Sequence, residues 1–331
     1  MADIVLLTGA SGFVGSAVAR KLIGAGFAVR ALIRPTSNVS RLAGLDLERA
    51  VGDLRDAEAV SRAMNGTRWV FHVAADYRMW APDPTEIYRS NVDGTRTLME
   101  AAMCSGVERV VYTSSVATLK TSPRGEIADE TMPLTEREAV GAYKRSKVAA
   151  ERLVETLVQK GLPAVIVNPS TPVGAGDVKP TPTGRIIIEA ATGRMPAFVD
   201  TGLNMVHVDD VAEGHMLALR HGRIGERYIL GGQNASLADI LRIVAETVGR
   251  RPPRFRIPRH AIIPLALAAE AIARRTGREP FVTMDGLRMA KNRMYFLSDK
   301  AERELGYKAR PFAEGIRDAV TWFRQGSYLS N

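Results

Sequence analysis

The 331-residue sequence has little of what a disulfide framework or a structural metal site requires, since it contains one cysteine and five histidines. A single cysteine excludes an intramolecular disulfide and is typical of proteins from a reducing compartment. Without clustered cysteine and histidine, a structural zinc site is not expected. We interpret Cys104, in the stretch AAMCSG, as a packing residue at a helix end and not as a nucleophile.

Long apolar runs are also missing. The most apolar later segment, residues 261–273, is too short to span a membrane and contains Pro264 and Glu270. The N-terminal stretch MADIVLLTGASG lacks the basic flank and apolar core of a signal peptide. We therefore expect a cytoplasmic protein, with a location at the periphery of the inner membrane as the alternative.

The net charge of +9 is concentrated in one region. Residues 250–293 contain ten arginines and one lysine against three acidic residues, a local excess of +8. Phe255 and Phe281 are the only aromatic residues there, so a stacking surface for single-stranded nucleic acid is not expected. A basic rim around an apolar segment suits an anionic ligand or a membrane surface better.

Short β-branched runs alternate with helical patterns over the first two-thirds of the chain, which predicts an α/β fold with a doubly wound parallel Rossmann sheet. After Pro169 a proline- and glycine-rich stretch breaks this pattern, and only brief returns follow near residues 204–232. We expect a dinucleotide-binding domain at residues 1–170, with those returns, and a smaller α/β substrate-binding lobe at residues 171–331. The predicted strands cover residues 3–8, 28–34, 48–53, 68–75, 108–115 and 163–169.

The stretch TGASGFVGS places Gly9, Gly12 and Gly15 directly after the first strand and at the start of a helix. This context predicts a tight turn, a close approach of the backbone to a pyrophosphate, and close packing of helix on strand. A helix N-terminus there would bind the phosphate charge. A purely structural turn is the alternative.

The end of the second strand reads ALIRPTSN, and Arg34 stands where a carboxylate would bond the ribose 2′-hydroxyl of NAD. An arginine can instead pair with a 2′-phosphate, and Ser37 follows as a neutral donor. This residue favours NADPH, with NAD as the alternative, unless Arg34 is only a solvated side chain.

Tyr143 and Lys147 lie four residues apart in GAYKRSKVAAE, on one face of a predicted helix. A lysine ammonium beside a phenol would lower the pKa of the phenol toward the range of a general acid or base. A solvated helix with one buried tyrosine is the competing interpretation.

These motifs, together with GDL after the third strand, HVAA at the end of the fourth and TSS at the end of the fifth, resemble the extended short-chain dehydrogenase/reductase family. The resemblance covers nearly the whole chain. Within the family, RPTSN and the TSS strand end are similar to the dihydroflavonol-reductase-like branch, and residues 74–102 look most like the hopanoid-associated sugar epimerases.

The resemblance implies catalytic roles for four residues: Tyr143 as proton donor and acceptor, Lys147 as the group that lowers its pKa and holds the nicotinamide ribose, Ser115 as a hydrogen-bond donor to the substrate oxygen, and Asn91 as their support. Ser114 and Thr113 are weaker alternatives to Ser115. His72 is expected to be structural. The residues implied in cofactor binding are Gly9, Ser11, Gly12, Phe13, Val14, Gly15, Arg34, Ser37, Asp53, Leu54, Ala74, Ala75, Lys147, Pro169, Ser170 and Val173.

Three functional classes remain at this point: an NADPH-consuming reductase, an epimerase or dehydratase that retains its cofactor, and a non-catalytic nucleotide-binding protein. The implied chemistry needs no metal, and a nucleophilic serine is disfavoured because no G-x-S-x-G elbow is present. The substrate is expected to be a small molecule, amphiphilic if a hopanoid carries the sugar- or polyol-like group. Tyr77, Met79 and Trp80, with an apolar lid at 261–273, are candidate contacts for it, or else part of the core. A homodimer is left open.

Overall fold

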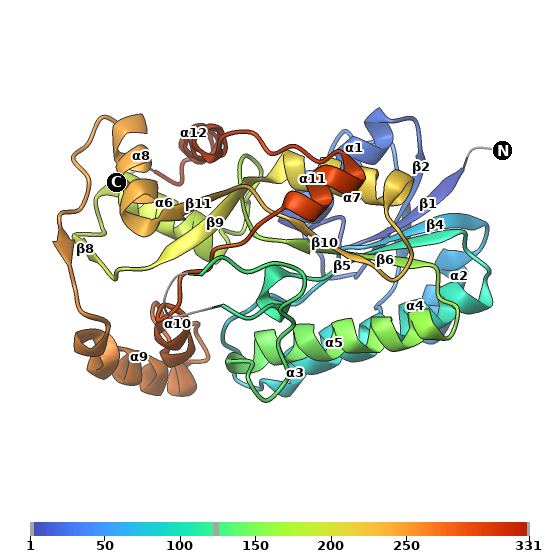
Figure 1. Cartoon of the computed structure of the whole chain (residues 1–331), viewed down its shortest axis with the longest axis horizontal. Coiled ribbons are helices and arrows are strands. Elements are labelled where there is room, and N and C mark those ends of the chain that lie inside the picture. Colours follow the sequence, from blue (N-terminus) through green and yellow to red (C-terminus); the bar gives the residue numbers. More distant parts are fainter. Residues whose placement is uncertain (1–2, 122–125, 330–331) are drawn as a thin grey trace.

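The computed structural model describes residues 3–121 and 126–329. Its centre is a seven-stranded sheet in the order β10-β6-β5-β4-β1-β2-β3, in which every neighbouring pair of strands is parallel. Figure 1 shows this sheet edge-on, with helices on both faces. The predicted doubly wound Rossmann fold is therefore confirmed. The strands are β1 Ile4–Thr8, β2 Ala28–Ile33, β3 Glu48–Val51, β4 Thr67–His72, β5 Arg109–Thr113, β6 Ala164–Pro169 and β10 Arg227–Leu230.

All six predicted strands form, but four of them end earlier than expected. β2 stops before Arg34, β3 before Asp53, β4 before Ala74 and β5 before Ser115. Those residues lie instead in the turns that leave the carboxyl edge of the sheet. In a doubly wound sheet ligands bind at this edge, where the strand order reverses, and the reversal here falls between β1 and β4.

Two apolar cores hold the helices on the sheet. One core joins the sheet to α1, α7 and α11, and the other joins it to α2, α4 and α5. The layers are visible above and below the sheet in Figure 1. These helices are α1 Phe13–Gly24, α2 Ala57–Met64, α4 Gly94–Cys104, α5 Gly141–Gln159, α7 Val208–His221 and α11 Asp299–Leu305.

Cys104 is the last residue of α4, as expected, but its side chain is exposed. The expectation that it packs in the core is wrong. The helix turns its buried face, including Leu98, Met99 and Ala102, toward the sheet, and Cys104 falls outside that face.

A second, three-stranded sheet in the order β11-β9-β7 carries α6, α8 and α12 around a third apolar core. Its strands are β7 Thr171–Val173, β9 Gly202–His207 and β11 Gln233–Ser236, and its helices are α6 Pro182–Thr192, α8 Leu237–Thr247 and α12 Phe312–Gln325. Within residues 204–232, α7 and β10 join the large sheet, whereas β9 belongs to the small one. The division of the chain at residue 170 stays a prediction.

The segment between these elements forms β8 Ala197–Phe198 paired with β12 Phe255–Arg256, then α9 Ile263–Thr276 and α10 Met284–Met289. Pro264 lies in the first turn of α9, where proline is well tolerated, so it does not interrupt the helix. Within the described residues, no helix is both long and apolar enough to cross a membrane.

Candidate functional site

The glycine turn between β1 and α1 is built so tightly that side chains would not fit. Gly9 has a φ of 74°, and a Cβ atom there would lie 2.5 Å from the Ala74 backbone nitrogen. A Cβ atom on Gly15 would overlap the carbonyl oxygen of Gly9. Two of the three predicted glycines are thus required by close backbone packing, and Gly12 closes the turn by donating to the Gly9 carbonyl at 2.8 Å.

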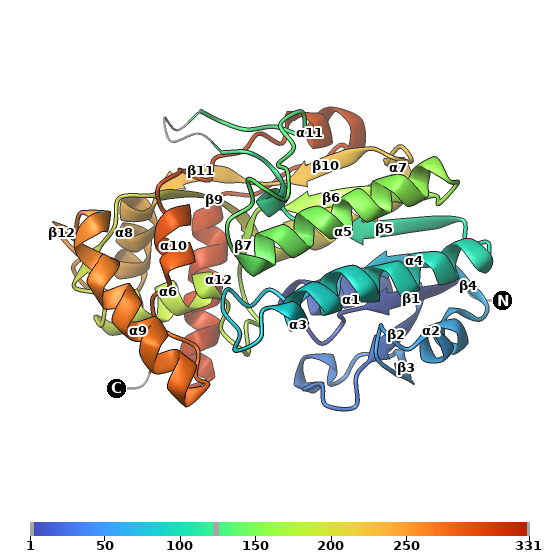
Figure 2. The same ribbon diagram turned by 90° about the horizontal axis from the view of Figure 1, so that it is seen from below.

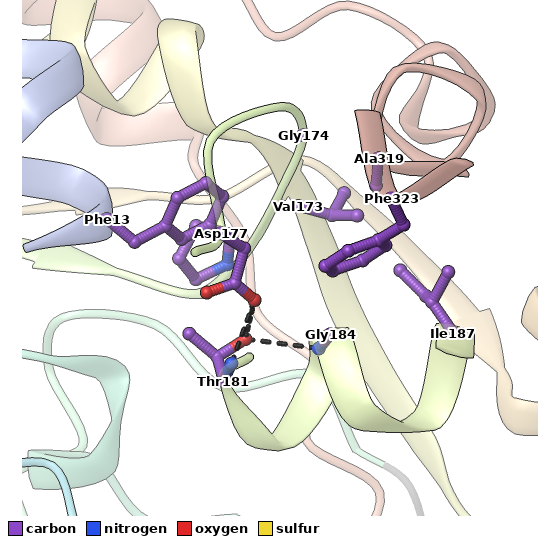
Figure 3. A pocket seen from close by; sticks show the side chains of 10 residues that line it. Phe13, Val173, Gly174, Asp177, Thr181, Gly184, Ile187, Ala319 and Phe323 are labelled. Carbon is purple, nitrogen blue, oxygen red and sulfur yellow. Dashed lines mark hydrogen bonds between the residues drawn. The ribbon is translucent and has the colours of Figure 1, made fainter. Parts of the chain in front are cut away.

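The start of α1 suits an anion. The N-cap of α1 is Gly12, so no side chain caps the first backbone N–H groups of the helix. The first turn of α1 carries no acidic residue. Backbone N–H groups at such a helix start bind phosphate. Ser11 and Val14 are half-buried at this turn, whereas Phe13 is buried and lines a narrow pocket with Val173 (Figure 3).

The ends of β2 and β3 bring further predicted cofactor residues together. Arg34 is exposed, and its carbonyl accepts a hydrogen bond from the Ser37 N–H at 3.0 Å. Asp53 lies close enough to Arg34 for the guanidinium to contribute to lowering the pKa of Asp53, although a hydrogen bond from Arg55 is the larger cause. Leu54 follows at the base of α4, where a Cβ atom on Gly94 would lie 3.1 Å from it. This edge therefore brings an exposed arginine, which forms no salt bridge within the described residues, near a carboxylate.

Arg41 is a residue that the sequence reasoning missed. Its guanidinium donates to the carbonyl of Ser11 at 2.8 Å and to the carbonyl of Gly176 at 2.7 Å, and it lies 3.9 Å from the Asp177 carboxylate. It therefore ties the glycine turn to the loop that follows β7. No local pattern marks Arg41, because its partners are distant in the sequence.

Tyr143 lies in the first turn of α5, beside the Ser115 side chain that follows β5. Burial raises the pKa of the Tyr143 phenol, and hydrogen bonding with Ser115 lowers it in part. The expectation that Lys147 lowers the pKa of Tyr143 is not met in this structure. The ammonium group points elsewhere, so burial dominates.

Lys147 is 2% exposed and donates to the Thr113 carbonyl at 2.9 Å and, at 3.5 Å, to the hydroxyl of Tyr112. Burial lowers the pKa of Lys147 to about 8, while the nearby Glu151 carboxylate acts in the opposite direction. The ammonium is thus held at the carboxyl end of β5, one helical turn from Tyr143.

Asn91 links α5 to the loop after β4. It lies in a π-helical segment, Arg89–Asp93, between α3 (Thr85–Tyr88) and α4. Its side chain accepts from the Asp76 N–H at 2.7 Å, donates to the Asp76 carbonyl at 2.9 Å, and donates to Ser146 Oγ at 2.9 Å. Widened turns of this kind occur often at functional sites. No pattern in the sequence distinguishes this segment from an ordinary helix.

His72 joins the glycine turn to Asn91 through its two ring nitrogens. The Thr95 hydroxyl donates to the Asn91 carbonyl at 2.6 Å, so it accepts from His72 Nε2 at 2.9 Å. Nδ1 then accepts from the Thr8 hydroxyl at 2.7 Å, and Thr8 Oγ1 accepts in turn from the Ala74 N–H at 3.3 Å. Burial lowers the pKa of His72 to about 3, so the ring is neutral, as its predicted structural role requires.

A buried polar network, also missed from the sequence, lies one helical turn beyond Lys147. Glu151 is 1% exposed and accepts from Thr118 Oγ1 at 3.0 Å and Asn168 Nδ2 at 2.8 Å. Its other oxygen pairs with Arg227 on β10 at 3.0 Å. The signal that could have found it is the spacing Y-x-x-x-K-x-x-x-E, which places Glu151 on the same helix face.

The remaining cofactor candidates border the same edge of the sheet. Pro169 ends β6, Val173 ends β7, and Ala75 is exposed after β4. Ser170 Oγ is buried, and among the described residues it has no hydrogen-bond partner. An orphaned hydroxyl and a turn that side chains would fill both fit a bound dinucleotide.

The loop after β4 carries the candidate substrate residues. Tyr77 is 40% exposed, and the groups that influence its pKa include Asp177 and Arg41, while Met79 and Trp80 are half-buried. Tyr77 thus lies near Arg41, the residue that joins the glycine turn to the loop after β7, and it is not part of the core.

Acid is expected to destabilise the fold through buried histidines. Burial lowers the pKa of His215, which is hydrogen-bonded to Thr113 at 2.8 Å, to about 4. An unfolded chain binds this proton near pH 6.5, so the stability from neutral His215 is lost as pH falls from about 6.5 to 4 and amounts to about 3 kcal/mol. Urea unfolding across this range tests it. His215→Gln should make the profile less steep by removing this contribution, while that of His72 remains. His260→Gln, at an exposed position, should leave the profile unchanged.

A doubly wound sheet with this glycine turn, a buried lysine and a tyrosine at the carboxyl edge defines a nucleotide-dependent oxidoreductase fold. The chain belongs to the NAD dependent epimerase/dehydratase family, whose sequence profile matches residues 5–231. The resemblance to extended short-chain dehydrogenases/reductases of the dihydroflavonol-reductase-like branch is thereby confirmed, and the protein is an enzyme of that family.

The chain is similar over its whole length to proteins with three different names. It is 42% identical to a Synechocystis protein provisionally named dihydroflavonol 4-reductase, over 99% of this chain and 97% of that one. It is 36% identical to sterol demethylase protein B of Methylococcus capsulatus, over 97% and 98%. The crystal structure of gox2253 is 52% identical, with a TM-score of 0.89 over 99% and 100% of the two chains.

Proposed function

We propose that the protein is an NADPH-dependent reductase that acts on a carbonyl of a sugar- or polyol-like group attached to an apolar body. Two observations support this proposal: Ser115, Tyr143 and Lys147 lie together at the carboxyl edge of the sheet, and the residue that follows β2 is Arg34 and not a carboxylate. The other cofactor candidates frame the same edge.

The proposed reaction assigns one task to each side chain. NADPH, when bound, supplies hydride to the carbonyl carbon. Tyr143, whose phenol is protonated at neutral pH, donates the proton to the oxygen. Ser115 donates a hydrogen bond to the same oxygen, and Lys147 holds the nicotinamide ribose. Asn91 keeps α5 in register with the loop at Asp76.

The proposed substrate class draws on the relatives' names and on the exposed Tyr77 after β4. One relative is named for dihydroflavonol reduction and another for sterol demethylation, and both names refer to polycyclic molecules. A hopanoid lipid, as the resemblance implies, is polycyclic as well. We infer an apolar ring system that enters beside Tyr77, with the reacting carbonyl at Tyr143.

An epimerase or dehydratase is the second candidate, because the matching family is named for these reactions. Such an enzyme oxidises and re-reduces one bound substrate, so its cofactor can remain bound. Arg34 favours the reductase, since the cellular pool of NADPH is kept reduced. A non-catalytic nucleotide-binding protein is disfavoured by the intact set of Ser115, Tyr143 and Lys147.

We also propose the division of labour between the two parts of the chain. Residues 1–170, with α7 and β10 returning to the sheet, would bind the cofactor, and the rest of residues 171–331 would bind the substrate. The enzyme would work in the cytoplasm and meet its amphiphilic substrate at the inner membrane.

Arg34→Asp is expected to raise the dissociation constant for NADPH at least tenfold, because a carboxylate repels the 2′-phosphate and a charged hydrogen bond is lost. Binding of NADH should be unchanged or improved. Titration of protein fluorescence with both nucleotides gives the ratio of the dissociation constants for NADPH and NADH. Arg49→Asp, an equal charge change at an exposed position of β3, is the control and should leave the ratio near that of the parent. An unchanged ratio in Arg34→Asp would show that Arg34 is only solvated.

A further inference from the structure

The helix α9 is built in the reverse of the usual pattern for a surface helix. Its buried residues are the small ones, Ala266, Ala269 and Ala273. Its large apolar side chains point outward, at exposures of 36% for Ile263, 51% for Leu265, 55% for Leu267 and 62% for Ile272. A soluble helix normally turns its largest apolar residues to the core. We call these four residues the α9 face.

The α9 face lies at one end of the molecule, and α10 connects it to the start of the helix that carries Tyr143. Glu270 of α9 accepts a hydrogen bond from the Met284 N–H at the start of α10, at 2.7 Å. In α10, the Asp285 carboxylate lies 2.9 Å from where a Cβ atom of Gly141 would be, at the start of the helix that carries Tyr143. Figure 2 shows α9 as the outermost helix of this end of the molecule, with α10 on its inner side. The α9 face is therefore outside the catalytic centre and close to it.

Exposed arginines flank α9 on both sides in the sequence. Arg274 and Arg275 lie in its last turn and Arg278 just beyond, all three exposed, and Arg251, Arg254 and Arg256 are exposed on the segment before it. Of these six, only Arg274 has an acidic partner within the described part of the chain, Glu270 at 4.0 Å. The local net charge of residues 250–293 is +8.

We propose that the α9 face docks the enzyme on an anionic lipid bilayer. An outward apolar face with a cationic rim matches a helix that lies in the membrane interface, with its aliphatic side chains among the acyl chains and its arginines at the head groups. At 14 residues α9 is too short to span the bilayer, so the contact is peripheral.

A second copy of the chain fits this surface less well than a membrane does. A twofold interface brings the same patch of both copies together, and here that would set one +8 region against another. Like charges across an interface oppose association. An anionic surface meets both properties of the patch, the apolar face and the excess of positive charge.

The docking surface is independent of the proposed reaction, since none of its residues touches the catalytic set. Vesicle binding without substrate or nucleotide therefore tests it separately from the reductase proposal. The full chain is floated with phosphatidylcholine vesicles that either contain or lack phosphatidylglycerol, at low and at high salt. Binding should require phosphatidylglycerol and be lost at high salt, because the surface charges are screened.

Two triple variants show whether the apolar side chains and the arginines contribute to vesicle binding. Leu265→Gln/Leu267→Gln/Ile272→Gln should lower the partition constant at least tenfold, and Arg274→Gln/Arg275→Gln/Arg278→Gln should lower it about fivefold per arginine. Ile224→Gln, at an apolar residue with a similar exposure of 52%, is the matched control and should bind like the parent. All changes are on exposed side chains, and circular dichroism confirms folding.

Failure of the parent to bind phosphatidylglycerol vesicles would overturn the proposal, as would binding that the triple leucine and isoleucine variant retains. Light scattering without lipid tests whether a second copy of the chain covers the α9 face. A dimer that this variant converts to a monomer would show that a second copy covers the α9 face, and the membrane proposal would then be wrong.

Discussion

Tyr143→Phe is expected to lower turnover by a factor of about 10² or more, the usual contribution of a general acid. Only one hydroxyl is removed, so the fold and the nucleotide affinity should be retained. The hydroxyl lies at the Ser115 side chain, and burial raises its pKa, so it is protonated at neutral pH. The effect should fall on kcat and not on the dissociation constant for NADPH.

The measurement is the rate of NADPH oxidation with a carbonyl compound that the parent reduces, compared between parent and variant. Thermal unfolding and nucleotide titration show whether the change is confined to chemistry. Tyr88→Phe removes the hydroxyl of a tyrosine that is 41% exposed and should be without effect. Turnover of Tyr143→Phe within a few-fold of the parent would remove Tyr143 from the mechanism.

Glu151→Gln is expected to change both stability and pH dependence. The carboxylate is buried against Arg227, Thr118 and Asn168, and breaking a buried ion pair costs about 3 kcal/mol of the free energy of unfolding. Glu151 also raises the pKa of Lys147 against the effect of burial. Without it, Lys147 should lose its proton at a lower pH, and the basic limb of the kcat/KM profile, near pH 8 in the parent, should move to lower pH.

Glu155→Gln separates the two effects. Glu155 pairs with Arg227 as well, from the exposed side of the network, but it is not among the groups that influence the pKa of Lys147. This variant should be destabilised and keep the pH profile of the parent. Denaturant unfolding gives the free energies of unfolding of the parent and both variants. Values of kcat/KM between pH 6 and 10 give the position of the basic limb of each pH profile. A profile of Glu151→Gln that overlies the parent would show that Glu151 is only structural.

The elements of the large sheet were predictable because their signals are local. The glycine turn, the β-branched runs and the Y-x-x-x-K spacing each lie within a few residues, and the structure has all of them. The ends of β2, β3, β4 and β5 were placed too late, and only after β4 do apolar residues such as Val73 continue the pattern into the turn. What ends those strands is the departure of the chain from the sheet edge, which no local pattern records.

The partners across the fold could not be read from the sequence. Arg41 reaches Gly176 and Glu151 reaches Arg227, over 135 and 76 positions in the chain respectively, and only the folded sheet brings them together. The pKa of Tyr143 was predicted in the wrong direction for the same reason. The spacing places Lys147 on the right face of α5, but the Thr113 carbonyl holds its ammonium, and burial then decides the pKa of the phenol.

The central claim is that Arg34 selects NADPH for a reductase built on Ser115, Tyr143 and Lys147. The most direct test is to release the nucleotide from freshly purified protein by denaturation and to identify it by mass. We predict that the released nucleotide is NADP or NADPH. If the purified protein carries no nucleotide, we predict that it binds NADPH more tightly than NADH. Recovery of NAD in nearly every molecule would contradict the account, because a retained NAD is what an epimerase or dehydratase requires.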